Sequence, residues 1–333
     1  MASAATKDVG SAGMVYLVWI AGWKLILALA LLSLPATAQS RSVALSFDDL
    51  PLAFAGAPAH ATAERRLAET QAVNAAILSA LKQHHAHAIA FVNEKKVLSD
   101  GLEKEYRSIL SAWIKDGHEL GNHTFAHLDL SKISAEEFEK EVIAGEASVK
   151  PLMSHAGQVL HYLRFPYNHT GETAEKHAAV AAFLKQRGYE VATCTVDNSD
   201  WVFARAYSLM LDRHDAPAAA RLRAAYLDYT RQELDYYTGL HRQIFGREIP
   251  HVMLLHSNRL NADALDQVLK VFEQAHYRFV SLEKAQSDAA YQTSDAYLTE
   301  AGPMWGYRWA RQLNIKVDGS REPEVPGWVS EYR

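Results

Sequence analysis

The sequence contains very little cysteine, since Cys194 is the only one among its 333 residues. A single thiol cannot form an intrachain disulfide, so cysteine pairing does not indicate a redox compartment. The chain also lacks a long basic run and any interleaving of aromatic and basic residues. Together with a formal net charge of −5, this absence argues against a nucleic-acid-binding protein and favours a neutral or weakly charged ligand.

After residue 40 the sequence contains no internal repeat, low-complexity tract or linker. Its 22% charged and 49% hydrophobic residues are typical of an ordinary globular protein, which excludes a disordered or fibrous chain. A chain of 333 residues can bury a sizeable core as one large barrel or as two ordinary domains. Length alone does not decide between the two.

The N-terminal segment differs in character from the rest of the chain. Residues 14–34 are apolar except for Lys24, and the small-residue site Ala-Thr-Ala follows at 36–38. This order is typical of a secretory signal peptide, so we expect residues 1–38 to be cleaved after Ala38. The protein would then be secreted or periplasmic, without a stable membrane span. The alternative is an uncleaved anchor that crosses a bilayer despite its lysine.

Downstream of this segment, apolar runs of strand length alternate with segments of helical periodicity. We expect strands at 43–47, 88–92, 161–166, 189–196, 251–255 and 278–282, and helices at 62–83, 102–115, 134–155, 174–187 and 261–275. The alternation predicts one α/β domain, residues 41–285, whose strands close into a parallel barrel. A helical insertion, 203–248, precedes the last strands and is expected to break near Ala216-Pro217. Residues 286–333 would form a C-terminal extension packed on the barrel.

Two histidines, His123 and His127, lie four residues apart. On a helical turn this spacing would place both imidazoles on one face, where both can reach one metal ion. The pair alone is weak evidence in a chain with 16 histidines. Asp48 and Asp49, however, end the first expected strand. One of them can complete a site of two histidines and one carboxylate.

Five short segments fall at expected strand ends, where barrel enzymes carry their catalytic residues. They are Ser46-Phe-Asp-Asp49, His123-x3-His127, Arg164-Phe-Pro-Tyr167, Asp197-Asn-Ser-Asp-Trp201 and Leu254-Leu-His256. In type and order, over residues 43–282, this set resembles the five motifs of the NodB-homology polysaccharide deacetylases, carbohydrate esterase family 4. The resemblance implies a distorted (β/α) barrel.

The resemblance also implies one divalent metal ion, held by Asp49, His123 and His127. This ligand set favours Zn²⁺, with Co²⁺, Ni²⁺ or Mn²⁺ as alternatives. Asp48 matches the family's catalytic base. His256 matches the general acid that protonates the leaving amine, which departs poorly otherwise.

Five further residues match supporting positions of the family. Arg164 would pair with the base and keep it ionised, and Asp200 would orient His256 and raise its pKa. The backbone N–H of Tyr167 would hold the oxyanion of the tetrahedral intermediate. Trp201 and Leu254 would form the apolar pocket for the acetyl methyl group.

The activity implied is that of a secreted, metal-dependent deacetylase, which uses metal-activated water to hydrolyse N-acetyl groups of N-acetylglucosamine-containing glycans. Its substrate would be an acetylated glycan such as a chitin oligosaccharide or peptidoglycan. Two alternatives remain, an O-acetyl esterase acting on xylan and a non-catalytic glycan-binding barrel. The retained ligands, base and acid disfavour the second.

The chain departs from the family pattern at two motifs. Ser46 stands where threonine is common, and Ser257-Asn258 follow His256 where an acidic residue often comes next. The fourth and fifth motifs are also far apart because of the helical insertion. Substrate specificity is therefore the property that the resemblance transfers least, since insertions at the rim of a barrel reshape its cleft.

Several other features have simple structural interpretations. The cluster of His84, His85 and His87 ends a helix, so we expect a solvated C-terminal turn rather than a second metal site. Cys194 lies in an apolar strand and is expected to be an inert core thiol. Aromatic residues of the insertion and of the tail either pack as core or form a wall of the substrate groove: Tyr226, Tyr229, Tyr236, Tyr237, Trp305, Tyr307 and Trp309.

Overall fold

The computed structural model describes Met1, residues 41–53 and residues 62–332. The expected signal peptide therefore lies, apart from its first residue, outside the described residues. Within these ranges, none of the helices has the length and apolar character needed to cross a membrane.

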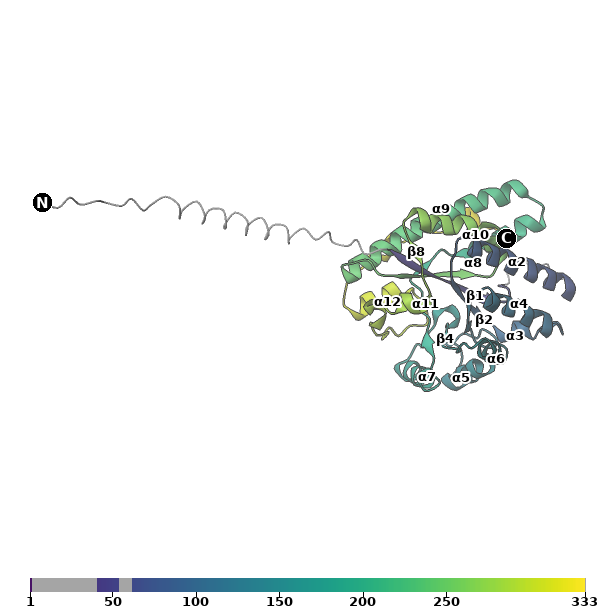
Figure 1. The fold of residues 1–333 in the computed structure, drawn as a ribbon, viewed down its shortest axis with the longest axis horizontal. Helices are drawn as coiled ribbons and strands as arrows, with labels where there is room; N and C mark the ends of the chain where they lie inside the picture. Colours follow the sequence, from purple (N-terminus) through teal and green to yellow (C-terminus); the bar gives the residue numbers. More distant parts are fainter. Residues whose placement is uncertain (2–40, 54–61, 333) are drawn as a thin grey trace. The chain divides into compact units, whose positions relative to one another are not determined.

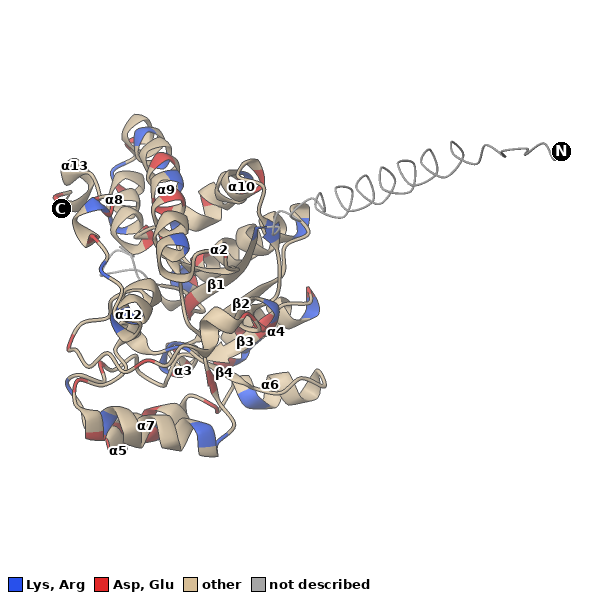
Figure 2. Cartoon of the chain, turned by 90° about the vertical axis from the view of Figure 1, so that its left-hand side faces the viewer, with Lys and Arg blue, Asp and Glu red and all other residues tan. Residues whose placement is uncertain are grey.

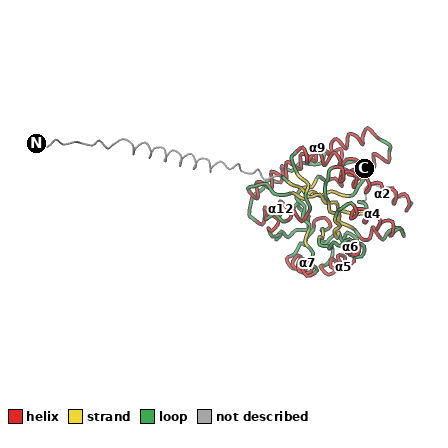
Figure 3. Tube along the Cα trace, viewed as in Figure 1, coloured by secondary structure: helices red, strands yellow, loops and turns green. Residues whose placement is uncertain are grey.

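A parallel sheet of eight strands forms the centre of the described chain (Figures 1 and 3). The strands are β1 (Ser42–Leu50), β2 (Ala88–Val92), β3 (Glu119–Asn122), β4 (Tyr162–Leu163), β5 (Glu190–Val191), β6 (Val196–Asp197), β7 (His251–His256) and β8 (Arg278–Phe279). Their order is β5-β4-β3-β2-β1-β7-β6, and β8 pairs with β1. Strands β5 and β6 end this order, yet only residues 192–195 connect them. The sheet must therefore curl until its two edges approach, and the fold is a distorted (β/α) barrel, as predicted.

Helices surround this sheet (Figure 1). They are α2 (Ala63–Gln83), α3 (Glu94–Val97), α4 (Glu103–Lys115), α5 (Ala135–Ala144), α6 (Val149–His155), α7 (Ala174–Gln186), α8 (Asp200–Asp212), α9 (Ala216–Phe245), α10 (Arg259–Gln274), α11 (Leu282–Gln286), α12 (Trp305–Gln312) and α13 (Gly327–Ser330). Three short 3-10 turns, η1 (Pro166–Asn168), η2 (Ala289–Gln292) and η3 (Gly319–Arg321), lie in the connections. Acidic and basic residues are mixed along the surface helices, α9 included (Figure 2). The expected pair of helices before the last strands is present as α8 and α9, separated at residues 213–215.

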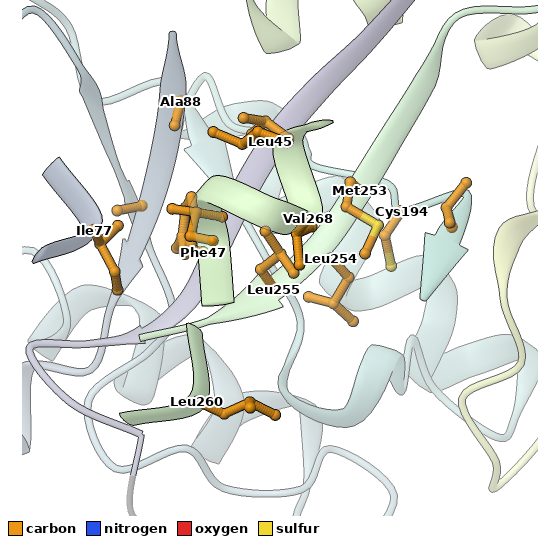
Figure 4. Close-up of a cluster of buried hydrophobic side chains, with 14 of the residues drawn as sticks. Leu45, Phe47, Ile77, Ala88, Cys194, Met253, Leu254, Leu255, Leu260 and Val268 are labelled. Carbon is orange, nitrogen blue, oxygen red and sulfur yellow. The ribbon is translucent and has the colours of Figure 1, made fainter. Parts of the chain in front are cut away.

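The hydrophobic core holds β1 and β7 in place. Helix α10 buries apolar side chains at helical spacing, among them Leu260, Leu265, Val268 and Phe272. The buried side chains labelled in Figure 4 come from β1, β2, β7, α2, α10 and the 192–195 connection, and include Phe47, Leu255, Ile77 and Val268. Cys194 is fully buried in the same core, where burial raises the pKa of its thiol to about 11. The ends of β1 and β7, which carry Asp48 and His256, are thus rigidly supported.

Two predicted elements are each divided in the structure. The expected helix 134–155 is two helices, α5 and α6, and the capping box of Ser134 and Glu137 opens the first of them, as predicted. The chain turns after α5, where a Cβ on Gly145 would lie 2.5 Å from Asn122 Oδ1. The expected strand 189–196 is β5 and β6, because residues 192–195 cross between the two edges of the curled sheet.

In the histidine cluster that follows α2, the prediction of a solvated helix terminus is confirmed for His85, which is exposed, but is wrong for His84, whose side chain is only 7% exposed. Helix α2 packs against α10 and places the His84 ring 2.8 Å from a carboxylate oxygen of Glu273 and 3.0 Å from one of Asp266. Burial acts to lower the pKa of His84, but the two acids outweigh it and raise the pKa. His84 therefore makes a helix-to-helix contact.

Candidate metal centre and catalytic cleft

The two aspartates at the end of β1 both line one cavity. In a regular strand, neighbouring side chains point to opposite faces of the sheet. Here the pairing of β1 with β2 shifts register between Phe47 and Leu50, and Asp49 takes a left-handed conformation with φ 71°. Such an irregularity turns a side chain to a new direction. It brings Asp48 and Asp49 to the same side.

The segment that carries the two histidines is a loop, so the prediction of a helical turn is wrong. It follows β3 and contains two left-handed residues, Thr124 with φ 65° and His127 with φ 58°. The loop is held by hydrogen bonds from Thr124 N–H to Asn122 Oδ1 (2.8 Å) and from Phe125 N–H to Glu141 O (3.1 Å). The two imidazole centroids still lie 4.8 Å apart. The bent loop thus brings the rings together without helical geometry.

Asp49, His123 and His127 form a compact group of possible metal ligands. One ligand atom from each lies within 4.8 Å of the other two, and His84, His85 and His87 form no such group in the described ranges. His123 Nδ1 lies 2.8 Å from Arg164 O, which leaves Nε2 for a metal. Burial lowers the pKa of both ligand histidines to about 4, so they are neutral, as metal ligands must be.

The carboxylate of this group suits the same purpose. Burial by itself would raise the pKa of Asp49, but the positive charge of Lys96 opposes this rise, and the pKa lies well below its usual range. Its Oδ1 is buried, and its charged neighbour is the ammonium group of Lys96. A buried, ionised oxygen beside two neutral imidazoles fits a divalent metal ion.

Lys96 of α3 is a residue of this centre that the sequence analysis missed. Its Nζ lies 3.0 Å from Asp49 Oδ1. The residue lies outside the five motifs, and its place on a short helix gives no signal in the sequence. A bound metal ion and this ammonium group would share the charge of one carboxylate.

Asp48 lies beside the metal group and is almost fully buried. Arg164 Nη1 is 3.4 Å from each of its carboxylate oxygens, and the guanidinium is also held by Ala192 O (2.6 Å) and Ser46 Oγ (3.0 Å). Burial raises the pKa of Asp48, and the positive charge of Arg164 opposes this rise. Ser46, which replaces the usual threonine, thus positions the arginine that faces the proposed base.

His256 lies next to Asp48, because the two residues are register partners in β1 and β7. Its Nδ1 is 2.6 Å from Asp200 Oδ1, and its backbone N–H donates to Asp200 Oδ2 at 2.8 Å. Burial acts to lower the pKa of His256, but the charge and hydrogen bond of Asp200 outweigh it and raise the pKa to about 10. Asn258, where the chain departs from the family pattern, donates a third hydrogen bond to Asp200. The imidazole is therefore protonated at neutral pH.

The remaining predicted residues lie at the same cavity, which has a volume of about 1180 Å³. Tyr167 and Trp201 line it and are 56% and 60% exposed, whereas Leu254 lines it from β7 and is buried. Tyr167 lies within η1 and has a left-handed φ of 58°. Arg164 and Asp200 do not line the cavity but are buried behind Asp48 and His256.

The family model described as polysaccharide deacetylase matches residues 36–192. Over these residues the chain is similar to that family. The matched residues include the metal group, Asp48 and Arg164, whereas Asp200 and His256 lie beyond them. The placement of the last two residues therefore depends on the geometry described above.

The chain spans only part of the length of the curated relatives that it matches. It is 27% identical over 223 residues to an uncharacterized 30.6 kDa protein of Geobacillus stearothermophilus, covering 66% of this chain and 68% of that protein. It is 30% identical over 125 residues to a peptidoglycan-N-acetylglucosamine deacetylase of Bacillus cereus, covering 38% and 40%. A solved structure of a CE4 family pseudoenzyme from Bacillus anthracis matches with a TM-score of 0.49 and 15% identity, over 74% of this chain and 66% of that one.

The helical insertion and the C-terminal tail both contribute to the cavity wall. Helix α9 contributes Glu233 and Tyr237, and the C-terminal segment contributes Met304, Tyr307 and Glu322. The two glutamates carry no signal of a site in the sequence, because acidic residues within a charged helix or a loop are usually solvated. Several aromatic residues, by contrast, pack in the core: Tyr226, Tyr229, Trp305 and Trp309.

The C-terminal segment also fixes the loop that carries Tyr167. Arg308 is fully buried and donates hydrogen bonds to Asn168 O (2.6 Å) and to Asp295 Oδ2 (2.9 Å). Gly302 packs so closely that a Cβ there would lie only 1.8 Å from Tyr167 O. The tail therefore holds the η1 loop in place at the cavity.

Replacing Gly302 with Ala is expected to displace the η1 loop and lower kcat for the proposed reaction. Overpacking of this kind costs about 1–3 kcal/mol, so we expect the melting temperature to fall as well. Acetate release and thermal unfolding would measure both effects. Gly239→Ala is a matched control, since a Cβ there meets nothing within 4 Å. Unchanged kcat for Gly302→Ala would show that the loop is not held by this contact.

Proposed function

We propose that this protein is a metal-dependent polysaccharide deacetylase that hydrolyses N-acetyl groups of glycans containing N-acetylglucosamine. The observation that carries this proposal is the arrangement in one cavity of Asp48, His256 and the Asp49–His123–His127 group. A buried carboxylate and a protonated imidazole on adjacent strands are a suitable base and acid for amide hydrolysis. We assign the catalytic domain to residues 41–285.

The proposed reaction uses these groups in order. A divalent metal held by Asp49, His123 and His127, most simply Zn²⁺, would act as a Lewis acid that polarises the acetyl carbonyl. A water molecule attacks the carbonyl carbon through its oxygen. Asp48 accepts a proton from this water molecule during the attack.

The later steps depend on residues across the cavity. The backbone N–H of Tyr167 stabilises the oxyanion. His256 donates its proton to the sugar nitrogen as the C–N bond breaks, which leaves acetate and a free amine. Asp200 keeps the ring oriented and charged until that transfer. Trp201 and Leu254 supply the apolar surface for the acetyl methyl group.

The state of His256 favours amide over ester hydrolysis. An alkoxide leaves more readily than an amine, so an esterase has less need of a protonated general acid. A histidine whose pKa is raised to about 10 carries its proton at neutral pH and can supply it to an amine. The glycans we propose are extracytoplasmic polymers, which agrees with the cleavage expected after Ala38.

Acetate release from three substrates tests the proposal. Metal-stripped and zinc-reconstituted protein would be incubated with N-acetyl-chitooligosaccharide, peptidoglycan and acetylxylan. We expect acetate from at least one of the first two, only after zinc is restored, with Co²⁺, Ni²⁺ and Mn²⁺ compared in parallel. Acetate release from acetylxylan alone would contradict the proposed amide hydrolysis and indicate an O-acetyl esterase. No acetate from any substrate would favour a glycan-binding protein.

A further inference from the structure

The cavity of the metal centre has a second group of acidic residues, which we call the acidic end. It consists of Asp197 from β6, Glu233 from α9 and Glu322 from the C-terminal segment. The three carboxyl groups interact, since Asp197 and Glu322 each raise the pKa of Glu233. No ion pair within 4.0 Å joins any of them to a Lys or Arg of the described ranges.

Glu233 is the informative member of this group. Its side chain lines the cavity, yet the residue is only 1% exposed, and neither carboxylate oxygen has a hydrogen-bond partner among the described residues. The nearby Tyr229 hydroxyl donates instead to Pro323 O at 3.1 Å. Burial raises the pKa of Glu233 to about 8. Buried acceptors of this kind are rare, because they cost stability unless a ligand or water satisfies them.

The other two carboxylates are held in position. Glu322 accepts hydrogen bonds from the hydroxyls of Tyr237 and Tyr307, the second at 2.6 Å. Asp197 accepts one from Ser199 N–H at 2.8 Å, and burial raises its pKa to about 6. The charges of Asp200 and His256 also act on Asp197, so the acidic end adjoins the proposed general acid.

The chemistry of the acidic end selects a ligand with positive charge and several N–H donors. A divalent metal ion fits the acidic end less well. In the described ranges, the group whose ligand atoms lie close enough together to hold a metal ion is Asp49, His123 and His127. A protonated primary amine has three donors on one nitrogen and suits carboxylates that surround it loosely. The tyrosines and Met304 on the same wall offer flat and apolar surface beside it.

The size of the cavity indicates where such an amine comes from. Pockets for small ligands have volumes of about 300–1000 Å³. A cavity of about 1180 Å³ that continues from the metal centre to the acidic end can take more than one sugar unit. N-deacetylation itself makes sugar amines, which are protonated at neutral pH. A glycan chain that has already lost one acetyl group therefore carries the ligand that the acidic end selects.

We propose that Glu233, Glu322 and Asp197 form a subsite for the protonated amine of a glucosamine unit adjoining the acetylated sugar at the metal centre. This inference rests on the proposed function, because it extends the same substrate along the same cavity. It makes the protein a deacetylase that prefers partly deacetylated chains. Its product is then a better substrate than its starting material.

Kinetics on defined oligosaccharides test the preference. Zinc-loaded protein would act on chitotetraose that is fully acetylated and on chitotetraose with one free amine next to an acetylated unit, with each position of the amine compared. We expect kcat/KM to be about tenfold higher for the best amine-bearing substrate, mainly through KM, as one charge-assisted hydrogen bond allows.

Single substitutions then locate the preference. Glu233→Gln should bring the ratio of the two kcat/KM values close to one. If Glu233→Gln does not fold, Asp197→Asn tests the same expectation. Glu136→Gln makes the same substitution in a side chain that is 78% exposed on α5 and should keep the tenfold ratio. Equal kcat/KM for both substrates with the wild-type protein would overturn the subsite while leaving the deacetylase proposal intact.

Equilibrium binding separates the two proposals. Calorimetry would measure a fully deacetylated chitosan oligosaccharide and a lysine-containing tripeptide against zinc-loaded wild type and Glu233→Gln. We expect the oligosaccharide to bind at least tenfold more weakly to the variant. If binding is weakened in this way but the wild-type protein releases no acetate, the amine subsite is supported and the proposal of a deacetylase is overturned. Binding of the peptide alone would assign the acidic end to a peptide ammonium and overturn the amino-sugar proposal.

Discussion

Replacing Asp48 with Asn is expected to lower kcat for acetate release by a factor of about 10²–10⁴ while a metal ion stays bound. The change keeps the shape of the side chain but removes the proton acceptor, and it leaves Asp49, His123 and His127 untouched. Steady-state kinetics and the metal content of the purified variant, measured by mass spectrometry, check the two halves of this prediction.

The same substitution has a structural cost that must be measured separately. Arg164 is 1% exposed and faces the Asp48 carboxylate, so an amide at that position leaves a buried guanidinium without its counter-charge. We expect a lower melting temperature but a folded protein. Asp116→Asn, at an exposed helix end, is a control that should change neither property. Normal turnover by Asp48→Asn would remove the assignment of the base.

Replacing His127 with Ala should abolish both metal binding and activity. Loss of a direct ligand is expected to weaken metal affinity by more than the roughly 10–100-fold that loss of an outer-shell partner costs. His127 lies in a loop and its side chain is 23% exposed, so the fold should tolerate the change. Metal content after dialysis and acetate release would both fall to background. His155→Ala removes an exposed imidazole from α6 and is the matched control.

Thermal unfolding gives a readout of this prediction that does not depend on activity. A metal that binds the folded state stabilises it by about 2.7 kcal/mol when its concentration is 100 times the dissociation constant. Zinc should therefore raise the melting temperature of the wild-type protein and leave that of His127→Ala unchanged. A stoichiometric metal ion in purified His127→Ala would contradict the proposed ligand set.

The local properties of the chain were predictable because they depend on neighbours in sequence. The capping box at Ser134 and Glu137, the runs 88–92 and 251–255, and the break before Pro217 follow from side-chain periodicity, caps and proline geometry. The proposed base, acid and metal ligands were selected in the same way, since they belong to short motifs at strand ends. Parallel pairing then brings those ends to one side of the sheet.

Where long-range contacts override local pattern, the sequence was misleading. His123 and His127 have helical spacing, yet hydrogen bonds to Asn122 and Glu141 hold them in a bent loop. The apolar run 189–196 resembles one strand, but the closing of the barrel divides it into two.

The sequence by itself determined the alternation of strands and helices, the family resemblance and the residues proposed for the reaction, because each is written in a short stretch of chain. Only the tertiary structure revealed Lys96 beside Asp49, the tail that holds the Tyr167 loop, and Glu233 facing the cleft without a partner. These contacts join residues tens or hundreds of positions apart. Whether a charge meets a counter-charge, solvent or an empty cleft depends on what the fold places beside it, and local periodicity carries no record of that.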